Sequence, residues 1–199
     1  MVEPVARGVK VEGRADIFPD HQGRLREALG TADVEVEHIG STSVPGLAAK
    51  PTVDIVVTVV DITAEEDYLP ALVAAGYELR TREPGHHLVR PAARAVHIDI
   101  LHRGDQAVEN YRIFRNQLRA DSDDRVLCAD TKRALLHQGF DDMNADADAQ
   151  TAVIAATMGR AFSAGTSRRN QLAGSAALRA DASQIGACHP VSWPLGCVG

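Results

Sequence analysis

One stretch of the chain limits its fold more than any other. Residues 52–60 are rich in β-branched side chains and nearly all apolar, and they contain a single carboxylate, Asp54. The run is far too short to span a bilayer as a helix, and its composition is typical of a strand that is buried on both faces of a sheet. Such a strand needs a packing layer on each side. The pattern therefore predicts a sheet covered by helices, with a buried carboxylate inside it.

The rest of the first half adds further strands and two short helices. Hydrophobic alternation and β-branched content indicate strands at 34–39, 52–60, 77–80, 86–90 and 95–101. The last two of these are expected to pair antiparallel. A helix is expected over 18–29, and a second one over 67–76, where Pro70 fits the first turn.

The second half is predicted to be helical. From Gln106 onward, Ala107, Tyr111, Phe114 and Leu118 form one apolar stripe. Two more helices are expected, over 124–138 with Leu127, Leu135 and Leu136 inward, and over 145–162 with Ile154, Met158 and Phe162 inward. Residues 163–199 lack a useful periodicity and are expected to form a poorly ordered tail. The prediction is an α+β domain over 1–162: a small mixed β-sheet flanked by helices, with a helical C-terminal region.

Charge and composition exclude several classes of protein. The formal net charge of -6 gives no global basic field for nucleic acid, although a local basic site is compatible with it. No apolar run is long enough to cross a membrane, and residues 1–10 lack the apolar region of a secretory signal. Cys128, Cys188 and Cys197 are too scattered for a disulfide framework or a zinc knuckle. We therefore expect a cytoplasmic protein without a membrane partner.

A small, polar loop follows the first strand. Residues 38–47 spell His-Ile-Gly-Ser-Thr-Ser-Val-Pro-Gly-Leu. Gly40 permits a sharp turn and a close approach of another group, while the hydroxyls and amides of Ser41, Thr42 and Ser43 are suited to bind phosphate. The alternative is an ordinary connection between two elements. His38 is expected to brace the loop.

Two carboxylates accompany this loop. Asp54 is costly in an apolar strand unless it is paired, hydrogen-bonded or bound to a metal. Asp99 lies between Ile98 and Ile100 in a second strand. Two acids on neighbouring strands beside a phosphate loop are what a divalent metal bound to a triphosphate requires. The alternatives are that Asp54 caps a loop and that Asp99 belongs to a face in contact with solvent.

Other polar side chains are weaker candidates. Lys50 could contact a phosphate as a point charge or be an ordinary solvated lysine, and Arg94 is open to the same two interpretations. His97 could bind a metal, act as a base, or be structural. His86 and His87 are adjacent, so on a strand they face opposite ways and cannot both bind one ion.

The order of these motifs resembles a known superfamily. Ile39-Gly40-Ser41, then Asp54, then Ile98-Asp99-Ile100 is similar to the nucleotidyltransferase pattern, in which Gly-Gly or Gly-Ser precedes Asp-x-Asp or Asp-x-Glu and a third carboxylate follows. The longer string over 36–54 resembles the signature of the GrpB-like family, whose members occur alone and fused to dephospho-CoA kinase. The resemblance covers roughly residues 18–162. Supporting similarity comes from Gly76-Tyr77, Arg94, His97, Phe114-Arg115 and Leu118.

The resemblance implies a nucleotidyltransferase-like fold that binds an NTP or another phosphorylated small molecule with Mg²⁺. It implies that Asp54 and Asp99 are the metal ligands and catalytic residues, and that a nucleoside monophosphate is transferred to an unknown acceptor. The implied ligand-binding residues are Gly40, Ser41, Thr42, Ser43, Lys50, Arg94 and His97. Val56 replaces the second carboxylate of the pattern, which leaves two alternatives open. One is a non-catalytic binding or interaction module linked to coenzyme A metabolism, and the other is a metal-dependent phosphohydrolase.

Overall fold

A computed structural model describes residues 17–30, 34–47, 49, 52–93, 95–138 and 153–163. Two of the candidate ligand-binding residues, Lys50 and Arg94, lie outside these ranges. The tail expected over 163–199 also lies outside them, apart from its first residue, and so do residues 145–152 of the last expected helix.

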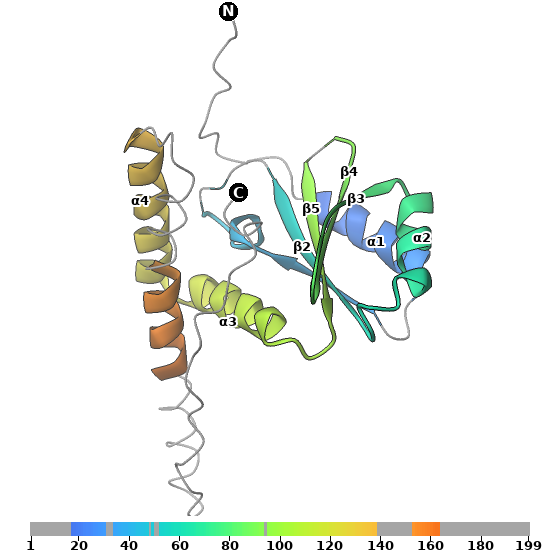
Figure 1. The fold of residues 1–199 in the computed structure, drawn as a ribbon. Coiled ribbons are helices and arrows are strands. Elements are labelled where there is room, and N and C mark those ends of the chain that lie inside the picture. Colours follow the sequence, from blue (N-terminus) through green and yellow to red (C-terminus); the bar gives the residue numbers. More distant parts are fainter. Residues whose placement is uncertain are drawn as a thin grey trace, which may run out of the picture.

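The sheet is mixed and has five strands in the order β1-β2-β5-β4-β3 (Figure 1). Its strands are β1 (Glu35–Ile39), β2 (Val53–Val59), β3 (Tyr77–Glu83), β4 (His86–Pro91) and β5 (Val96–His102). β2 and β5 pair in parallel at the centre, and the other neighbours pair antiparallel. All seven positions of β2 are buried, as its apolar composition predicts. The small mixed sheet and the antiparallel pairing of β4 with β5 are confirmed.

Helices cover both faces of the sheet (Figure 1). They are α1 (Ile17–Leu29), α2 (Leu69–Ala74), α3 (Gln106–Ala120) and α4 (Ser122–Gln138), with single 3₁₀ turns η1 (Ser41–Ser43) and η2 (Glu65–Asp67). Residues 153–163 are also helical. Against α1 and α2 the sheet buries a core that includes Leu25, Ile55, Leu72, Tyr77 and Ile98. On the opposite face Ile39, Val56 and Leu101 pack against Val108 and Tyr111 of α3. The expected α+β class is confirmed.

Two expectations about inward-facing residues are wrong. Leu127 of α4 is 42% exposed, whereas Asp124 and Cys128 on the same helix are buried. Asp124 accepts hydrogen bonds from Gln117 Nε2 at 2.7 Å and from Arg160 Nε at 2.6 Å, so polar contacts rather than leucines set the buried side of this part of α4.

The second error concerns the end of the last described helix. Phe162 is 48% exposed, while Ile154 and Met158 are buried as expected. Phe162 belongs to the last turn of the helical segment 153–163, one turn beyond the buried Met158. The side chains of Leu135 and Leu136 lie outside the described part of the chain.

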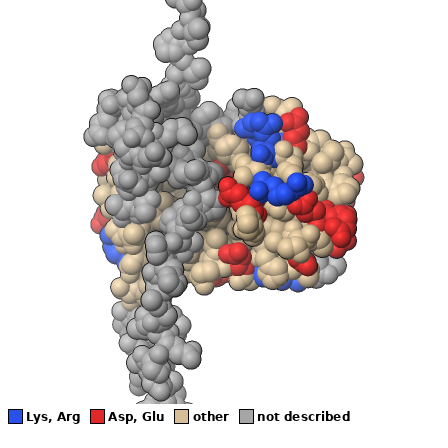
Figure 2. All heavy atoms as spheres, in the orientation of Figure 1, with Lys and Arg blue, Asp and Glu red and all other residues tan. Residues whose placement is uncertain are grey.

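The described surface is mixed in charge. Figure 2 shows acidic and basic side chains close together on the part of this face that is drawn in colour. Within the described ranges no helix is long and apolar enough to cross a membrane.

Candidate functional site

The Gly-Ser loop is a tight single turn at the end of β1. Gly40 has a φ of 68° and a ψ of -171°, and η1 follows it directly. Ser43 closes the turn, because its backbone N–H and its hydroxyl both donate to the Gly40 carbonyl oxygen, at 3.2 and 2.5 Å. Ser41 and Ser43 are buried. The loop is therefore a defined structure rather than an open connection.

Gly40 and Asp54 are packed directly against each other. Ile39 and Asp54 are register partners of the β1–β2 ladder, which places the carboxylate beside the turn. A Cβ atom at position 40 would lie 2.5 Å from Asp54 Oδ2 and 3.1 Å from Asp54 Cβ. Glycine is therefore needed here both for its positive φ and for the close approach of a side chain. The group that approaches closely is the carboxylate itself.

The structure places Asp54, Asp99 and His97 on one face of the central strand pair. Asp54 is the register partner of His97, and Val56 is the partner of Asp99. The exposed fractions of Asp54 and Asp99 are 3% and 0%. Within the described residues, Asp54 Oδ1 and Asp99 Oδ2 are buried and have no hydrogen-bond partner. Two buried acids with unpartnered oxygens are costly unless a cation or a hydrogen-bond donor reaches them.

The electrostatics of Asp54 reflect this arrangement. Burial raises the pKa of the Asp54 carboxyl above its ordinary value; nearby His97 and Lys132 act against the shift, and Asp99 adds to it. His97 Nδ1 lies 3.5 Å from Asp54 Oδ1, which is too long for a strong hydrogen bond. The raised pKa of Asp54 therefore comes first from its burial, and only in smaller part from the second acid.

His86 is a component of the site that the sequence did not indicate. Its Nε2 lies 2.8 Å from Asp99 Oδ1, and this contact with Asp99 raises the pKa of His86 against the effect of burial. His86 therefore binds one oxygen of Asp99, while among the described residues the other, Oδ2, has no hydrogen-bond partner. The expectation that His86 and His87 face opposite ways is confirmed, since His87 Nδ1 lies 2.6 Å from Tyr68 Oη elsewhere.

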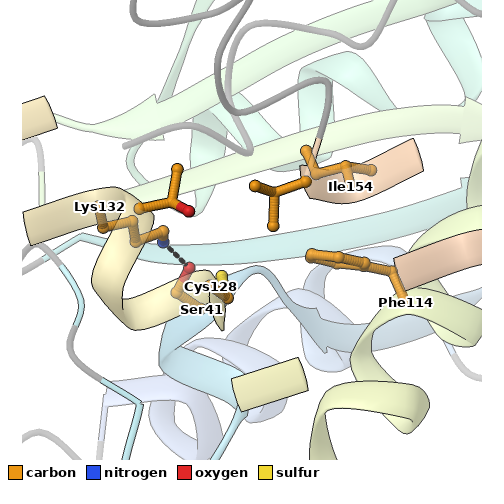
Figure 3. A pocket seen from close by; sticks show the side chains of 7 residues that line it. Ser41, Phe114, Cys128, Lys132 and Ile154 are labelled. Carbon is orange, nitrogen blue, oxygen red and sulfur yellow. Dashed lines mark hydrogen bonds between the residues drawn. The ribbon is translucent and has the colours of Figure 1, made fainter. Parts of the chain in front are cut away.

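Lys132 of α4 is a second component that the sequence did not indicate. Its ammonium donates a hydrogen bond to Ser41 Oγ, drawn as a dashed line in Figure 3. The same ammonium lowers the pKa of Asp54 through space. A positive charge therefore sits at the Gly-Ser loop, contributed by a helix far away in the sequence.

Two arginines on α3 hold the loop through its backbone carbonyl oxygens. Arg119 Nε and Nη2 donate to the Ser43 carbonyl oxygen at 3.0 and 2.7 Å, and Arg115 Nη1 donates to the His38 carbonyl oxygen at 2.9 Å. His38 Nε2 lies 3.0 Å from Thr42 Oγ1, so His38 braces the loop as expected. Burial and the charges of Arg119 and Arg115 lower the pKa of His38 to about 4, which keeps its imidazole neutral near pH 7.

The donor set fits a metal that also binds phosphate, and does not form a complete protein cage. Among the described residues no group of three or more His, Cys, Asp or Glu side chains is placed to hold a metal ion. The side chain at position 56 is a valine, which has no oxygen to offer a metal, and it is buried in an apolar cluster. Mg²⁺ is commonly held by one or two carboxylates together with substrate phosphates and water. Asp54 and Asp99 have the chemistry for that mode of binding.

A family model and a relative of known sequence each match most of this chain. The model of the GrpB protein family matches residues 12–160. A UPF0157 protein of Streptomyces coelicolor is 60% identical over 150 residues, which cover 75% of this chain and 80% of that protein. A dephospho-CoA kinase of Mycolicibacterium paratuberculosis is 37% identical over 93 residues, or 45% of this chain and 23% of the kinase.

A solved structure has a similar fold. The crystal structure of the conserved protein GrpB from Enterococcus faecalis matches with a TM-score of 0.66 and 24% sequence identity, covering 78% of this chain and 99% of that chain. The chain belongs to the GrpB family. The resemblance carried by residues 36–54 is thereby confirmed.

Proposed function

We propose that this GrpB-family chain binds the triphosphate of a nucleotide together with one divalent metal ion, and transfers a nucleoside monophosphate to an acceptor. The observation that carries the proposal is the direct contact between Gly40 and Asp54. It joins a turn rich in hydroxyls to a buried carboxylate that has an unpartnered oxygen. A phosphate on the turn and a cation on the carboxylate would compensate each other's charge.

Each part of the site has a role in this proposal. The turn from Gly40 to Ser43 and the ammonium of Lys132 would bind phosphate oxygens. Asp54 and Asp99 would hold the metal, with His86 orienting Asp99. When bound, Mg²⁺ would neutralise negative charge on the phosphates. Arg119 holds the turn in place before any ligand binds. The hydrogen-bond donors of the turn therefore need little reorganisation when the ligand arrives.

The transfer itself needs few protein groups. An acceptor oxygen would attack the α-phosphorus while the bond to the bridging oxygen of the β-phosphate breaks and pyrophosphate leaves. The proton of the acceptor would pass to His97, whose side chain is 23% exposed and lies beside Asp54. Most of the rate enhancement would come from positioning and charge neutralisation.

Titration calorimetry of the full chain with ATP, GTP, CTP and UTP in the presence of Mg²⁺ tests the proposal. We expect binding of at least one Mg-nucleotide, and a loss of at least about tenfold in affinity in Asp54→Asn, because a neutral amide is a weak metal ligand. Asp123→Asn is the matched control, since Asp123 is an exposed acid in the first turn of α4. No binding of any of the four nucleotides to the folded wild-type protein would refute the proposal.

A second candidate function is a binding module without turnover. The observation that favours it is the buried valine at position 56, where the superfamily pattern has a second carboxylate. The partial match to a dephospho-CoA kinase suggests dephospho-CoA as a ligand for such a module. This candidate predicts that a ligand raises the melting temperature without being consumed. Transfer of radiolabel from an α-labelled NTP to any acceptor would exclude it.

A further inference from the structure

The arginines of α3 that reach the Gly-Ser loop differ in what they contact. Arg112 Nε and Arg115 Nη1 both donate to the carboxylate of Glu37, at 2.6 and 2.9 Å. Arg119 lies one turn further along α3, and it donates instead to the neutral carbonyl oxygen of Ser43, at 3.0 and 2.7 Å. The first two arginines are therefore paired with an acid, whereas the third is bound to the loop itself.

Arg119 carries a positive charge that no acid of the described residues compensates. Partial burial and the charge of Arg115 lower the pKa of Arg119, and no carboxylate in the described ranges acts against them. The guanidinium nevertheless keeps its charge, as arginines in proteins do. Together with Arg115, it lowers the pKa of His38, so its positive potential reaches the loop. The side chain is exposed, and an anion in solvent can approach it.

Arg119 also keeps hydrogen-bond donors for a ligand. The Ser43 carbonyl oxygen is bound by Nε and Nη2, which leaves the N–H groups of Nη1 and the second N–H of Nη2. Arginine binds phosphate through two such neighbouring N–H groups at once. Arg119 can therefore hold the loop and bind a phosphate at the same time.

The groups proposed to bind the triphosphate follow one another along the turn. Asp54, which would hold the metal, packs against the first residue of the turn. Lys132 donates to Ser41 Oγ in the middle, and Arg119 holds the carbonyl oxygen of Ser43 at the end. A chain of phosphates that starts at the metal and follows the turn meets Lys132 before Arg119. The outermost phosphate is therefore the one that reaches Arg119.

We infer that Arg119 binds the terminal phosphate of the nucleotide, and that the site thereby selects a nucleoside triphosphate over the matching diphosphate. The inference rests on the proposed function, because the metal and the turn place the inner phosphates. It gives Arg119 a second role beside its support of the loop. The two roles predict different results: a loosened loop weakens the binding of both nucleotides alike, whereas a lost phosphate contact weakens only that of the triphosphate.

Titration calorimetry of the full chain at saturating Mg²⁺ tests the inference by comparing ATP, GTP, CTP and UTP with their diphosphates. A charge-assisted contact predicts that a triphosphate binds about tenfold or more tightly than its diphosphate. Arg119→Gln should reduce this ratio to about threefold or less. Arg119→Lys keeps the charge without the paired donors, so its ratio should lie between the two. Arg125→Gln is the matched control, since Arg125 donates to the carbonyl oxygens of Leu118 and Arg119 rather than to the loop, and it should leave the ratio unchanged.

The possible failures are distinguishable. If no nucleotide binds, the proposed function fails and this inference fails with it. If triphosphates and diphosphates bind equally well to the wild type, phosphate binding stands and the inference is overturned. An unchanged ratio in Arg119→Gln, or an equal fall of the ratio in Arg125→Gln, would also overturn it. Where Arg119→Gln does not fold, Arg119→Lys takes its place, and a ratio equal to that of the wild type would count against the inference in the same way.

Discussion

Replacement of Gly40 by alanine tests whether the loop and the carboxylate form one unit. The substitution adds a single methyl group at a position whose φ is 68° and whose ψ is -171°. That methyl group would lie 2.5 Å from Asp54 Oδ2, whereas ordinary contacts begin at 3.4 Å. Asp54 cannot withdraw easily, because every position of β2 is buried.

The expected cost has two parts. A non-glycine residue in this backbone region costs of order 1–3 kcal/mol. Displacing Asp54 by about 1 Å within a close-packed strand costs about 1–3 kcal/mol more, as for other overpacked sites. We therefore expect Gly40→Ala to lower the free energy of unfolding by about 2–6 kcal/mol in total. It should also weaken Mg-nucleotide binding, since the displaced carboxylate no longer faces the site.

Denaturant unfolding monitored by circular dichroism measures the first effect. Gly85→Ala is the matched control, because Gly85 also has a positive φ, 78°, and nothing lies within 4 Å of the added Cβ atom. A double-mutant cycle with Asp54→Ala isolates the clash, which should shrink when the carboxylate is absent. Equal losses of stability for Gly40→Ala and Gly85→Ala, with no coupling to Asp54, would refute the reasoning.

Two further predictions concern the support of the loop. The pKa of His38, about 4 in the folded protein, lies below its unfolded value near 6.5, so the folded state binds fewer protons and stability falls as the pH drops through that window. Between pH 7 and pH 5 the free energy of unfolding of the wild type should fall by about 1–2 kcal/mol more than that of His38→Gln, after allowance for solvent screening. Urea titrations measure this free energy at each pH, and parallel curves for the two proteins would contradict the prediction. Arg119→Ala should cost about 1 kcal/mol and speed amide exchange at Ser43, because two donors to its carbonyl are lost. Arg133→Ala, which removes an exposed ion pair within α4, should leave both quantities nearly unchanged, and an equal effect of the two substitutions would exclude a role for Arg119 in holding the loop.

Local patterns predicted the sheet and its buried acid well. The apolar run around Asp54 permits only a strand with both faces covered, and the carboxylate is 3% exposed. His97, Asp99 and Leu101 lie two positions apart, so the alternation of a strand places them on one face. The burial of Asp99 could not be predicted from that alternation, since it depends on which side chains of β4 and α3 cover the face.

The missing parts of the site come from contacts between distant segments. Lys132 lies 91 positions from Ser41, and no periodicity in α4 distinguishes it from a solvated lysine. His86 meets Asp99 through the register of two antiparallel strands, which a one-residue shift would change. Leu127 illustrates the opposite error: hydrophobicity alone favoured an inward position, whereas the polar partners of Asp124 determine how α4 packs.

The parallel pairing of β2 with β5 has a consequence for how the protein assembles. Every other strand pair is antiparallel, and β3 and β4 are joined by a short turn. The central pair instead joins Asp54 to His97, 43 positions later in the chain, and closing so long a loop is slow compared with forming a hairpin. Asp54 and Asp99 lie on opposite sides of this one seam, so a chain in which the seam is still open has neither the acidic pair nor a complete ligand site. Any ligand held by both acids therefore binds only the finished sheet and stabilises it by mass action.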